Sequence, residues 1–120
     1  MDILLIEPGK SPVPATIEST LKAMQSAVGG CIEAVYPFEE PVALICHEEG
    51  KLQNLPPNRL LRHPETGMVY DVICGTFFLC SAPPDSEHFE SLSPEQIARY
   101  TAYFNRPEVF PGIFVVREVE

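Results

Sequence analysis

The sequence contains no tryptophan, three histidines and only eight basic residues among 120. The basic residues are scattered along the chain: Lys10, Lys22, Lys51, Arg59, Arg62, Arg99, Arg106 and Arg117. Proteins that bind nucleic acid through its phosphates depend on clustered lysine and arginine. Because the bases are dispersed and the net charge is −9 at pH 7, the sequence predicts no nucleic-acid binding.

Long hydrophobic runs are also missing. No apolar segment approaches the roughly 18–20 residues that cross a bilayer. The N-terminus carries Asp2 where a signal peptide has a basic region, and the apolar run Ile3–Ile6 is too short for its core. We therefore expect a cytoplasmic protein that does not associate with membranes.

The acidic excess of 17 acids over eight bases allows three interpretations. It fits mimicry of nucleic acid, and it fits attraction to a basic partner. It also fits ordinary solubilising charge. No acidic run is longer than two residues (Glu39-Glu40 and Glu48-Glu49), which favours the third interpretation.

The four cysteines include no Cys-x-x-Cys pair, which zinc sites normally use. Cys46, Cys74 and Cys80 fall in apolar segments, where a free thiol behaves as a small hydrophobic group. The three histidines are dispersed at no helical or strand spacing. We therefore expect free, mostly buried thiols, and we expect neither a metal nor a cofactor.

Hydrophobic periodicity and turn residues predict an α+β fold in one globular domain, residues 1–120. Two helices are expected on a mostly antiparallel sheet of about five to six strands, in the order β-α-β-β-(β-β)-α-β. The expected strands are 2–7, 31–36, 42–47 and 113–116, with a hairpin or one kinked strand over 69–80. Residues 52–68 are expected to be mostly loop because of Pro56, Pro57 and Pro64.

Both expected helices carry boundary signals. The spacing of Ile17, Leu21, Met24 and Val28 predicts a helix with one apolar face, which Gly29 and Gly30 end. The run Leu92-Ser93-Pro94-Glu95-Gln96 combines an N-cap serine, a first-turn proline and a capping-box glutamine. It predicts the start of the second helix, which Pro107 prevents from continuing.

Several phrases of the sequence resemble a known family. They are Ile6-Glu7-Pro8-Gly9-Lys10, Val28-Gly29-Gly30-Cys31-Ile32-Glu33, Tyr36-Pro37-Phe38, the turn at 48–51, Leu55-Pro56-Pro57-Asn58-Arg59 and Asp71-Val72-Ile73-Cys74-Gly75-Thr76-Phe77-Phe78. In this order they are similar to a small uncharacterised family, a domain of unknown function found in gut Firmicutes, their phages and conjugative elements. The resemblance implies an accessory role in a mobile element and transfers no catalytic residues.

Asn58, Arg59 and Asp71 are the candidate site residues. Arg59 offers a planar fork for a carboxylate or phosphate, and Asn58 can donate and accept. Asp71 interrupts an otherwise apolar strand. The favoured interpretation is structural: an Arg59–Asp71 ion pair that fixes the long loop to the sheet. The alternative is a polar ligand pocket.

Two classes of function therefore remain open. We favour a non-enzymatic interaction module whose acidic surface or exposed sheet edge binds a protein partner. The alternative is a small polar-ligand binder or minor enzyme that uses residues 58–71. A deep polar pocket at Asn58 and Arg59 would favour the ligand binder, and a flat acidic or apolar patch would favour the interaction module.

Overall fold

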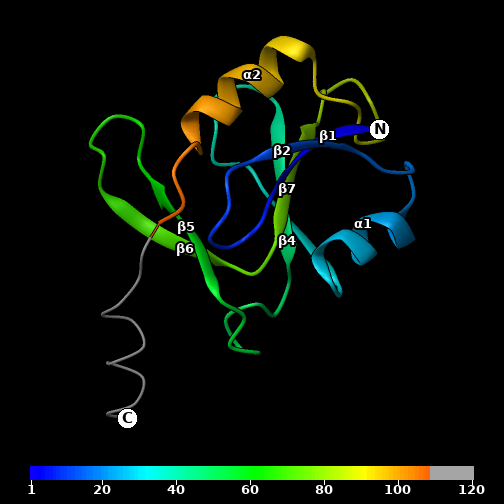
Figure 1. Cartoon of the computed structure of the whole chain (residues 1–120). Helices are drawn as coiled ribbons and strands as arrows, with labels where there is room; N and C mark the ends of the chain where they lie inside the picture. The colour runs from blue at the N-terminus through cyan, green and yellow to red at the C-terminus, as the bar shows by residue number, and fades with distance from the viewer. Residues whose placement is uncertain (109–120) are drawn as a thin grey trace, which may run out of the picture.

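A computed structural model describes residues 1–108, so the strand expected at 113–116 lies outside the described residues. Figure 1 shows the elements along the chain. They are β1 (Asp2–Ile6), β2 (Val13–Thr16), α1 (Leu21–Val28), β3 (Ile32–Val35), β4 (Val42–His47), β5 (Pro57–Arg62), β6 (Val69–Cys74), β7 (Phe77–Ser81) and α2 (Pro94–Tyr103). Within this part of the chain, no helix is both long and apolar enough to span a bilayer.

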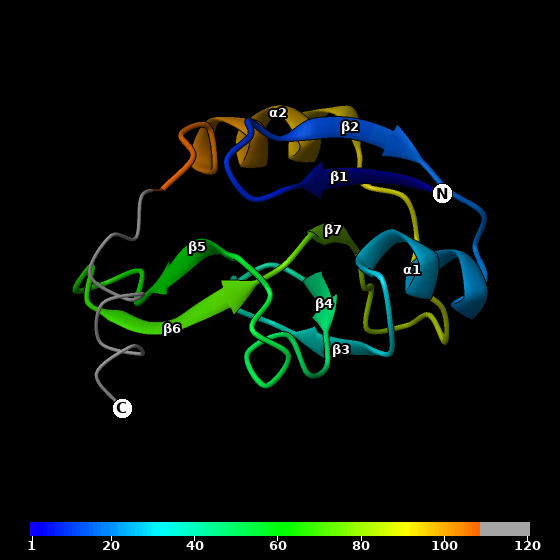
Figure 2. The same cartoon turned by 60° about the horizontal axis from the view of Figure 1, so that its bottom comes forward.

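The strands form two sheets. A five-stranded sheet has the order β2-β1-β7-β4-β3, and a two-stranded ribbon pairs β5 with β6. Every paired neighbour is antiparallel. Figure 2 shows the ribbon projecting beyond the larger sheet, on the side of the molecule away from α1. The predicted fold class, α+β with two helices and a mostly antiparallel sheet, is confirmed.

Strand β2 was not expected, and the helix begins at Leu21, later than the spacing from Ile17 predicted. The backbone groups of Met1 and Ile17 exchange two hydrogen bonds, of 2.7 and 3.0 Å, which extend the β1–β2 pairing. The helix begins only after Thr20, whose side chain accepts a hydrogen bond from the Ala23 amide. Ile17 nevertheless packs in the same cluster as Met24 and Val28, whereas Leu21 is 56% exposed. The spacing therefore identified three of the four core residues and placed the start of the helix too early.

Strand β5 occupies part of the segment that was expected to be loop. Pro57 is its first residue, a position where a strand tolerates the missing amide. The hairpin or kinked strand expected over 69–80 is instead two strands of different sheets, β6 and β7, and the chain bends between them at Gly75, with φ +86°. A Cβ at Gly75 would lie 2.8 Å from Leu55 Cδ1, so glycine also permits close packing there.

Alternating side chains give the larger sheet two buried faces. One face packs around α1 and includes Ile3, Ala43, Ile45, Phe78, Cys80 and Val28. The other face packs against the ribbon and α2 and includes Leu4, Leu44, Phe77 and Leu79 with Leu61, Ile73 and Phe104. Since β4 is buried at every position, it is enclosed from both sides.

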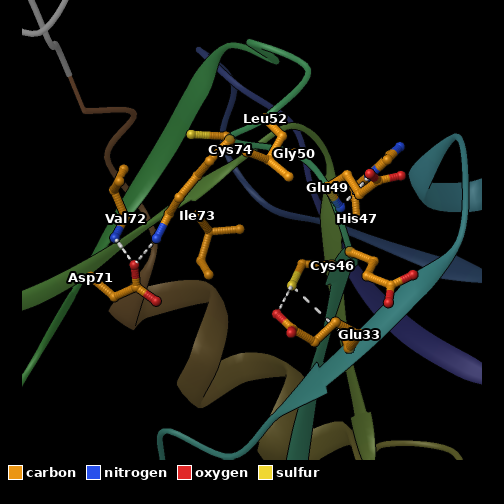
Figure 3. Close-up of a pocket in the computed structure, with 12 residues that line it drawn as sticks. Glu33, Cys46, His47, Glu49, Gly50, Leu52, Asp71, Val72, Ile73 and Cys74 are labelled. Carbon is orange, nitrogen blue, oxygen red and sulfur yellow. Dashed lines mark hydrogen bonds and ion pairs between the residues drawn. The ribbon is translucent and has the colours of Figure 1, made fainter.

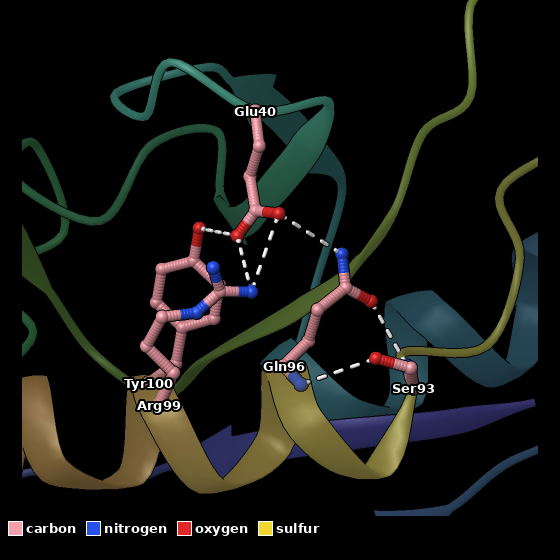
Figure 4. Close-up of polar contacts among 5 residues, drawn as sticks. All are labelled: Glu40, Ser93, Gln96, Arg99 and Tyr100. Carbon is pink, nitrogen blue, oxygen red and sulfur yellow. Dashed lines mark hydrogen bonds and ion pairs between the residues drawn. The ribbon is translucent and has the colours of Figure 1, made fainter.

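The start of α2 has the predicted capping box. Ser93 Oγ accepts from the Gln96 amide at 3.1 Å, and Gln96 Oε1 accepts from the Ser93 amide at 2.9 Å (Figure 4). Pro94 occupies the first helical turn, where its missing amide leaves no helical hydrogen bond unmade. Two otherwise unpaired amides are therefore satisfied at this helix end.

Replacing Ser93 with alanine should destabilise the protein by about 0.5–2 kcal/mol, because the Gln96 amide loses its acceptor. Urea denaturation followed by circular dichroism measures this change. Ser26→Ala makes the same chemical change on an exposed position of α1 and should not lower stability. Equal unfolding midpoints for wild type and Ser93→Ala would contradict the cap.

Candidate functional site

Asn58 and Arg59 are buried at the junction of the two sheets, with exposed fractions of 0% and 2%. Asn58 Nδ2 donates to the carbonyl oxygens of Ile6 and Gly75, both at 2.9 Å. Arg59 Nη1 donates to Asn58 Oδ1 at 2.8 Å and to the Asn58 carbonyl oxygen at 3.1 Å. The two side chains therefore form one polar unit that fixes β5 to β1.

Arg59 extends this unit to the end of α2. Its Nη2 donates to the carbonyl oxygens of Lys10 at 2.7 Å and Phe104 at 3.1 Å. Each carbonyl would otherwise lose its hydrogen bond to water on burial. These contacts give Arg59 a structural role, and they engage both terminal nitrogens of its guanidinium, Nη1 and Nη2.

Asp71 belongs to a different part of the molecule. Its carboxylate forms an ion pair with Lys51 and accepts from the Val72 amide at 2.8 Å. In the ribbon Arg59 lies opposite Ile73, whereas Asp71 lies opposite Leu61. The predicted Arg59–Asp71 ion pair is therefore wrong, and the structure brings Asn58 and Arg59 together but not Asp71. The physical reason is that backbone carbonyls, which the sequence cannot locate, accept from both terminal nitrogens of the buried guanidinium, while its Nε has no hydrogen-bond partner among the described residues.

Both outer edges of the ribbon are closed by carboxylates. Leu60 and Val72 are opposite each other, and their amides point away from the ribbon. The Leu60 amide donates to Glu108 Oε2 at 2.6 Å, and the Val72 amide donates to Asp71. An edge amide that is already bonded is unavailable to another strand.

The β2 edge of the larger sheet is closed by a proline. Since Met1 and Ile17 form a hydrogen-bonded pair, alternation places the Leu4–Pro14 pair in a non-hydrogen-bonded position. The Pro14 nitrogen therefore faces outward. Because proline carries no amide hydrogen, it removes a donor from this edge.

The β3 edge has no such protection among the described residues. The Glu48 amide donates to the Cys31 carbonyl oxygen at 2.8 Å, so alternation turns the amides and carbonyls of Ile32 and Ala34 away from β4. Strand β3 is the last in the sheet order and contains neither proline nor lysine. Tyr36, which follows it, is 60% exposed. Residues 32–35 thus present an open strand edge.

A cavity of about 300 Å³ lies beside β3 and separates it from β6 (Figure 3). Glu33, Cys46, Lys51, Leu52, Asp71 and Ile73 are among its lining residues. The Cys46 thiol lies 3.9 Å from Glu33 Oε1 and 3.7 Å from the Glu33 carbonyl oxygen. Burial, together with the negative charges of Glu33 and Asp71, raises the pKa of Cys46 to about 11.

A polar network on the other side of β3 joins the segment before β4 to α2 (Figure 4). The Glu40 carboxylate accepts from the Tyr100 hydroxyl and from Gln96 Nε2 and pairs with Arg99 at 3.0 Å. The Tyr100 hydrogen bond is the largest of the effects that lower the pKa of Glu40. Burial and this carboxylate raise the pKa of Tyr100. The network fixes the β3–β4 connection to the helix.

The remaining titratable groups of residues 1–108 include the cysteines and the side chains that could bind a metal. No group of three His, Cys, Asp or Glu side chains there is arranged to hold a metal ion. Cys46, Cys74 and Cys80 are buried, as predicted, whereas Cys31 is exposed, and none of the four forms a disulfide. Burial raises the pKa of Cys80 to about 12. A protonated thiol is a poor nucleophile, so Cys46 and Cys80 are poorly suited to nucleophilic attack.

Comparison with known proteins places the chain in a family. The model of a family described as "Domain of unknown function (DUF3846)" matches residues 1–105. The chain belongs to this family. Neither the curated proteins nor the solved structures gave a match. The DUF3846 match covers both helices and all the strands described above.

Thiol titration tests the cysteine environments of this DUF3846 domain. At pH 8 the native protein should show one fast-reacting thiol, Cys31, and unfolding in guanidinium should release all four. With a pKa of about 11, roughly one Cys46 thiol in a thousand is ionised at that pH. Cys31→Ser should remove the fast phase. Two fast thiols in the native protein would contradict this arrangement.

A double-mutant cycle tests the separation of Arg59 from Asp71. Arg59→Ala should lower the free energy of unfolding by about 3 kcal/mol or more, because several buried acceptors lose their donor. Asp71→Ala should lower it by about 1 kcal/mol, since the Lys51 pair is partly exposed. Urea denaturation should find the two effects additive within about 0.5 kcal/mol. A coupling energy above this value would mean that Arg59 and Asp71 interact directly.

Arg59→Lys serves as the control for charge in this cycle. Lysine keeps the positive charge but lacks the planar fork that reaches Asn58, Lys10 and Phe104 together. It should therefore also destabilise the protein. Wild-type stability of Arg59→Lys would mean that charge alone, rather than the hydrogen-bond geometry, is required.

Proposed function

We propose that the DUF3846 domain is a non-enzymatic protein-interaction module that binds an extended segment of a partner protein along β3. The observation that carries this proposal is the difference among the strand edges of the described chain. Pro14, Glu108 and Asp71 each close one edge, and β3 has no equivalent. An open edge attracts other strands, so soluble proteins usually block it unless pairing is its purpose.

Strand addition would use the backbone groups that β3 leaves free. The amides and carbonyls of Ile32 and Ala34 point away from β4 and supply hydrogen bonds to an added strand. Such bonds are independent of the partner's sequence, while neighbouring side chains provide selectivity. The exposed Tyr36 ring, in line with Ile32 and Ala34 on the α1 face, offers apolar contact for a partner side chain.

The alternative function, a polar-ligand binder or minor enzyme at Asn58, Arg59 and Asp71, has less support. The polar groups of Asn58 and Arg59 are buried and bonded to backbone carbonyls. Asp71 faces the cavity beside β3. A ligand that used all three residues would have to break the contacts between the two sheets.

The cellular setting is part of the same proposal. We infer a cytoplasmic accessory protein of a phage or conjugative element, on the basis of the sequence phrases that resemble this family. Free thiols are typical of a reducing compartment and agree with a cytoplasmic location. A module of this kind would act by occupying or presenting a partner protein.

Ala34→Pro tests the β3 edge directly. The Ala34 amide points outward, so proline removes a donor to the partner while leaving the bonds between β3 and β4 in place. A displayed library of random peptides, selected on the wild-type domain, should yield binders. Their affinity should fall at least about tenfold for Ala34→Pro. On binding, hydrogen exchange at the Ile32 and Ala34 amides should slow.

Ala34→Ser keeps the amide and serves as the matched control, with circular dichroism checking that both variants fold. Three results would overturn the proposal. One is a selection that enriches no peptide. Another is equal binding to wild type and folded Ala34→Pro. The third is a wild-type dimer in native mass spectrometry that Ala34→Pro dissociates, because the occupant of the edge would then be a second copy of the chain.

A further inference from the structure

The cavity beside β3 lies where side chains of an added strand would reach. Glu33 and Cys46 are ladder partners, so both side chains point to the sheet face that the ribbon covers. The Glu33 amide points toward β4, which makes Glu33 a non-hydrogen-bonded position for a strand added outside β3. Such positions bring Cα atoms to about 4.5 Å, so the facing partner residue would lie beside Glu33.

Glu33 has no cationic partner within 4.0 Å among the described residues. Its side-chain contact is the long one from the Cys46 thiol, at 3.9 Å. Figure 3 shows Glu33 facing across the cavity toward Asp71, which is already paired with Lys51. One carboxylate at the cavity therefore lacks a compensating charge.

The field in the cavity is negative. The pKa of Cys46 rises not only by burial but also through the charges of Glu33 and Asp71, and the opposing effect of Lys51 is smaller. The same field that disfavours a thiolate favours a cation. Leu52 and Ile73 add apolar surface, on which the aliphatic part of a lysine or arginine can lie.

The size of the cavity fits one side chain. Its volume of about 300 Å³ is at the lower limit of small-molecule pockets. Glu33, which lines the cavity from the edge strand β3, is exposed to solvent, so this part of the cavity can be reached from the strand edge. The occupant must therefore be narrow, positively charged and delivered along β3.

We propose that the cavity between β3 and β6 receives a lysine or arginine side chain of the partner strand, with Glu33 as its counter-ion. This inference rests on the proposed function, because strand addition delivers the side chain. It gives the partner a chemistry: an extended segment with a basic residue opposite Glu33. It also assigns a binding role to part of the acidic excess of the chain.

Peptides selected on the wild-type domain provide the test. They should be enriched in lysine or arginine at one fixed position, and replacing that residue with glutamine should weaken binding about three- to tenfold. Glu33→Gln should lower the affinity for the basic peptide by a similar factor and leave the affinity for the glutamine peptide unchanged. Binding of the basic peptide should also weaken with added salt.

Glu39→Gln is the matched control, because it removes one exposed acidic charge near β3 from a residue that does not line the cavity. It should change the affinity less than twofold. The cation site is overturned if selected peptides lack a basic residue, or if Glu33→Gln and Glu39→Gln behave alike. If Ala34→Pro still abolishes binding in that case, the strand-addition proposal stands alone. If Ala34→Pro also has no effect, both proposals fail.

Discussion

The arrangement of the two sheets depends on one buried cation and the carbonyls around it. Burying a guanidinium is unfavourable, and hydrogen bonds from its terminal nitrogens offset part of this cost. Here Arg59 donates to Asn58, Lys10 and Phe104, which belong to the ribbon, the β1–β2 connection and the end of α2. Asn58 adds bonds to Ile6 and Gly75. Three segments distant in sequence are therefore held at one point, and the ribbon keeps its position relative to the larger sheet.

That position creates the surfaces on which the proposed function depends. The ribbon holds Asp71 and Ile73 opposite Glu33 and Cys46, and the space between these pairs is the cavity beside β3. Because the other described edges are blocked, β3 is the edge left for the proposed strand pairing. A fold with a fixed ribbon and one open edge is thus suited to binding an extended chain in a defined register.

Local signals in the sequence predicted the elements whose boundaries depend on neighbouring residues. The capping box at Ser93, the left-handed Gly29 and the bend at Gly75 all lie where the sequence indicated. Strands β2 and β5 were missed because their prolines are typical of loops, and pairing with distant strands outweighs that preference. Long-range pairing has no signature in a single sequence.

In the candidate site too, local signals in the sequence were informative and long-range contacts were not. Arg59 was rightly selected as unusual, but an arginine buried against backbone carbonyls looks in sequence like one that pairs with a carboxylate. Residues 31–36 were expected to form a strand, yet an edge strand cannot be distinguished from a central one until the strand order is known. Glu33 was overlooked for this reason. Glu33 alternates with the apolar residues Ile32 and Ala34. This pattern points to a binding residue only once β3 is known to be an edge strand.

The closure of the β5 edge has a consequence for relatives of this protein. Glu108, which accepts from the Leu60 amide and pairs with Arg62, lies beyond residues 1–105, the part matched by the family. The protection of that edge therefore comes from outside the shared region. A protein with this fold but no acceptor at that point would leave the Leu60 amide without its side-chain acceptor. Under the proposed function, the residues just after α2 would thus decide whether the β5 edge is open in addition to β3.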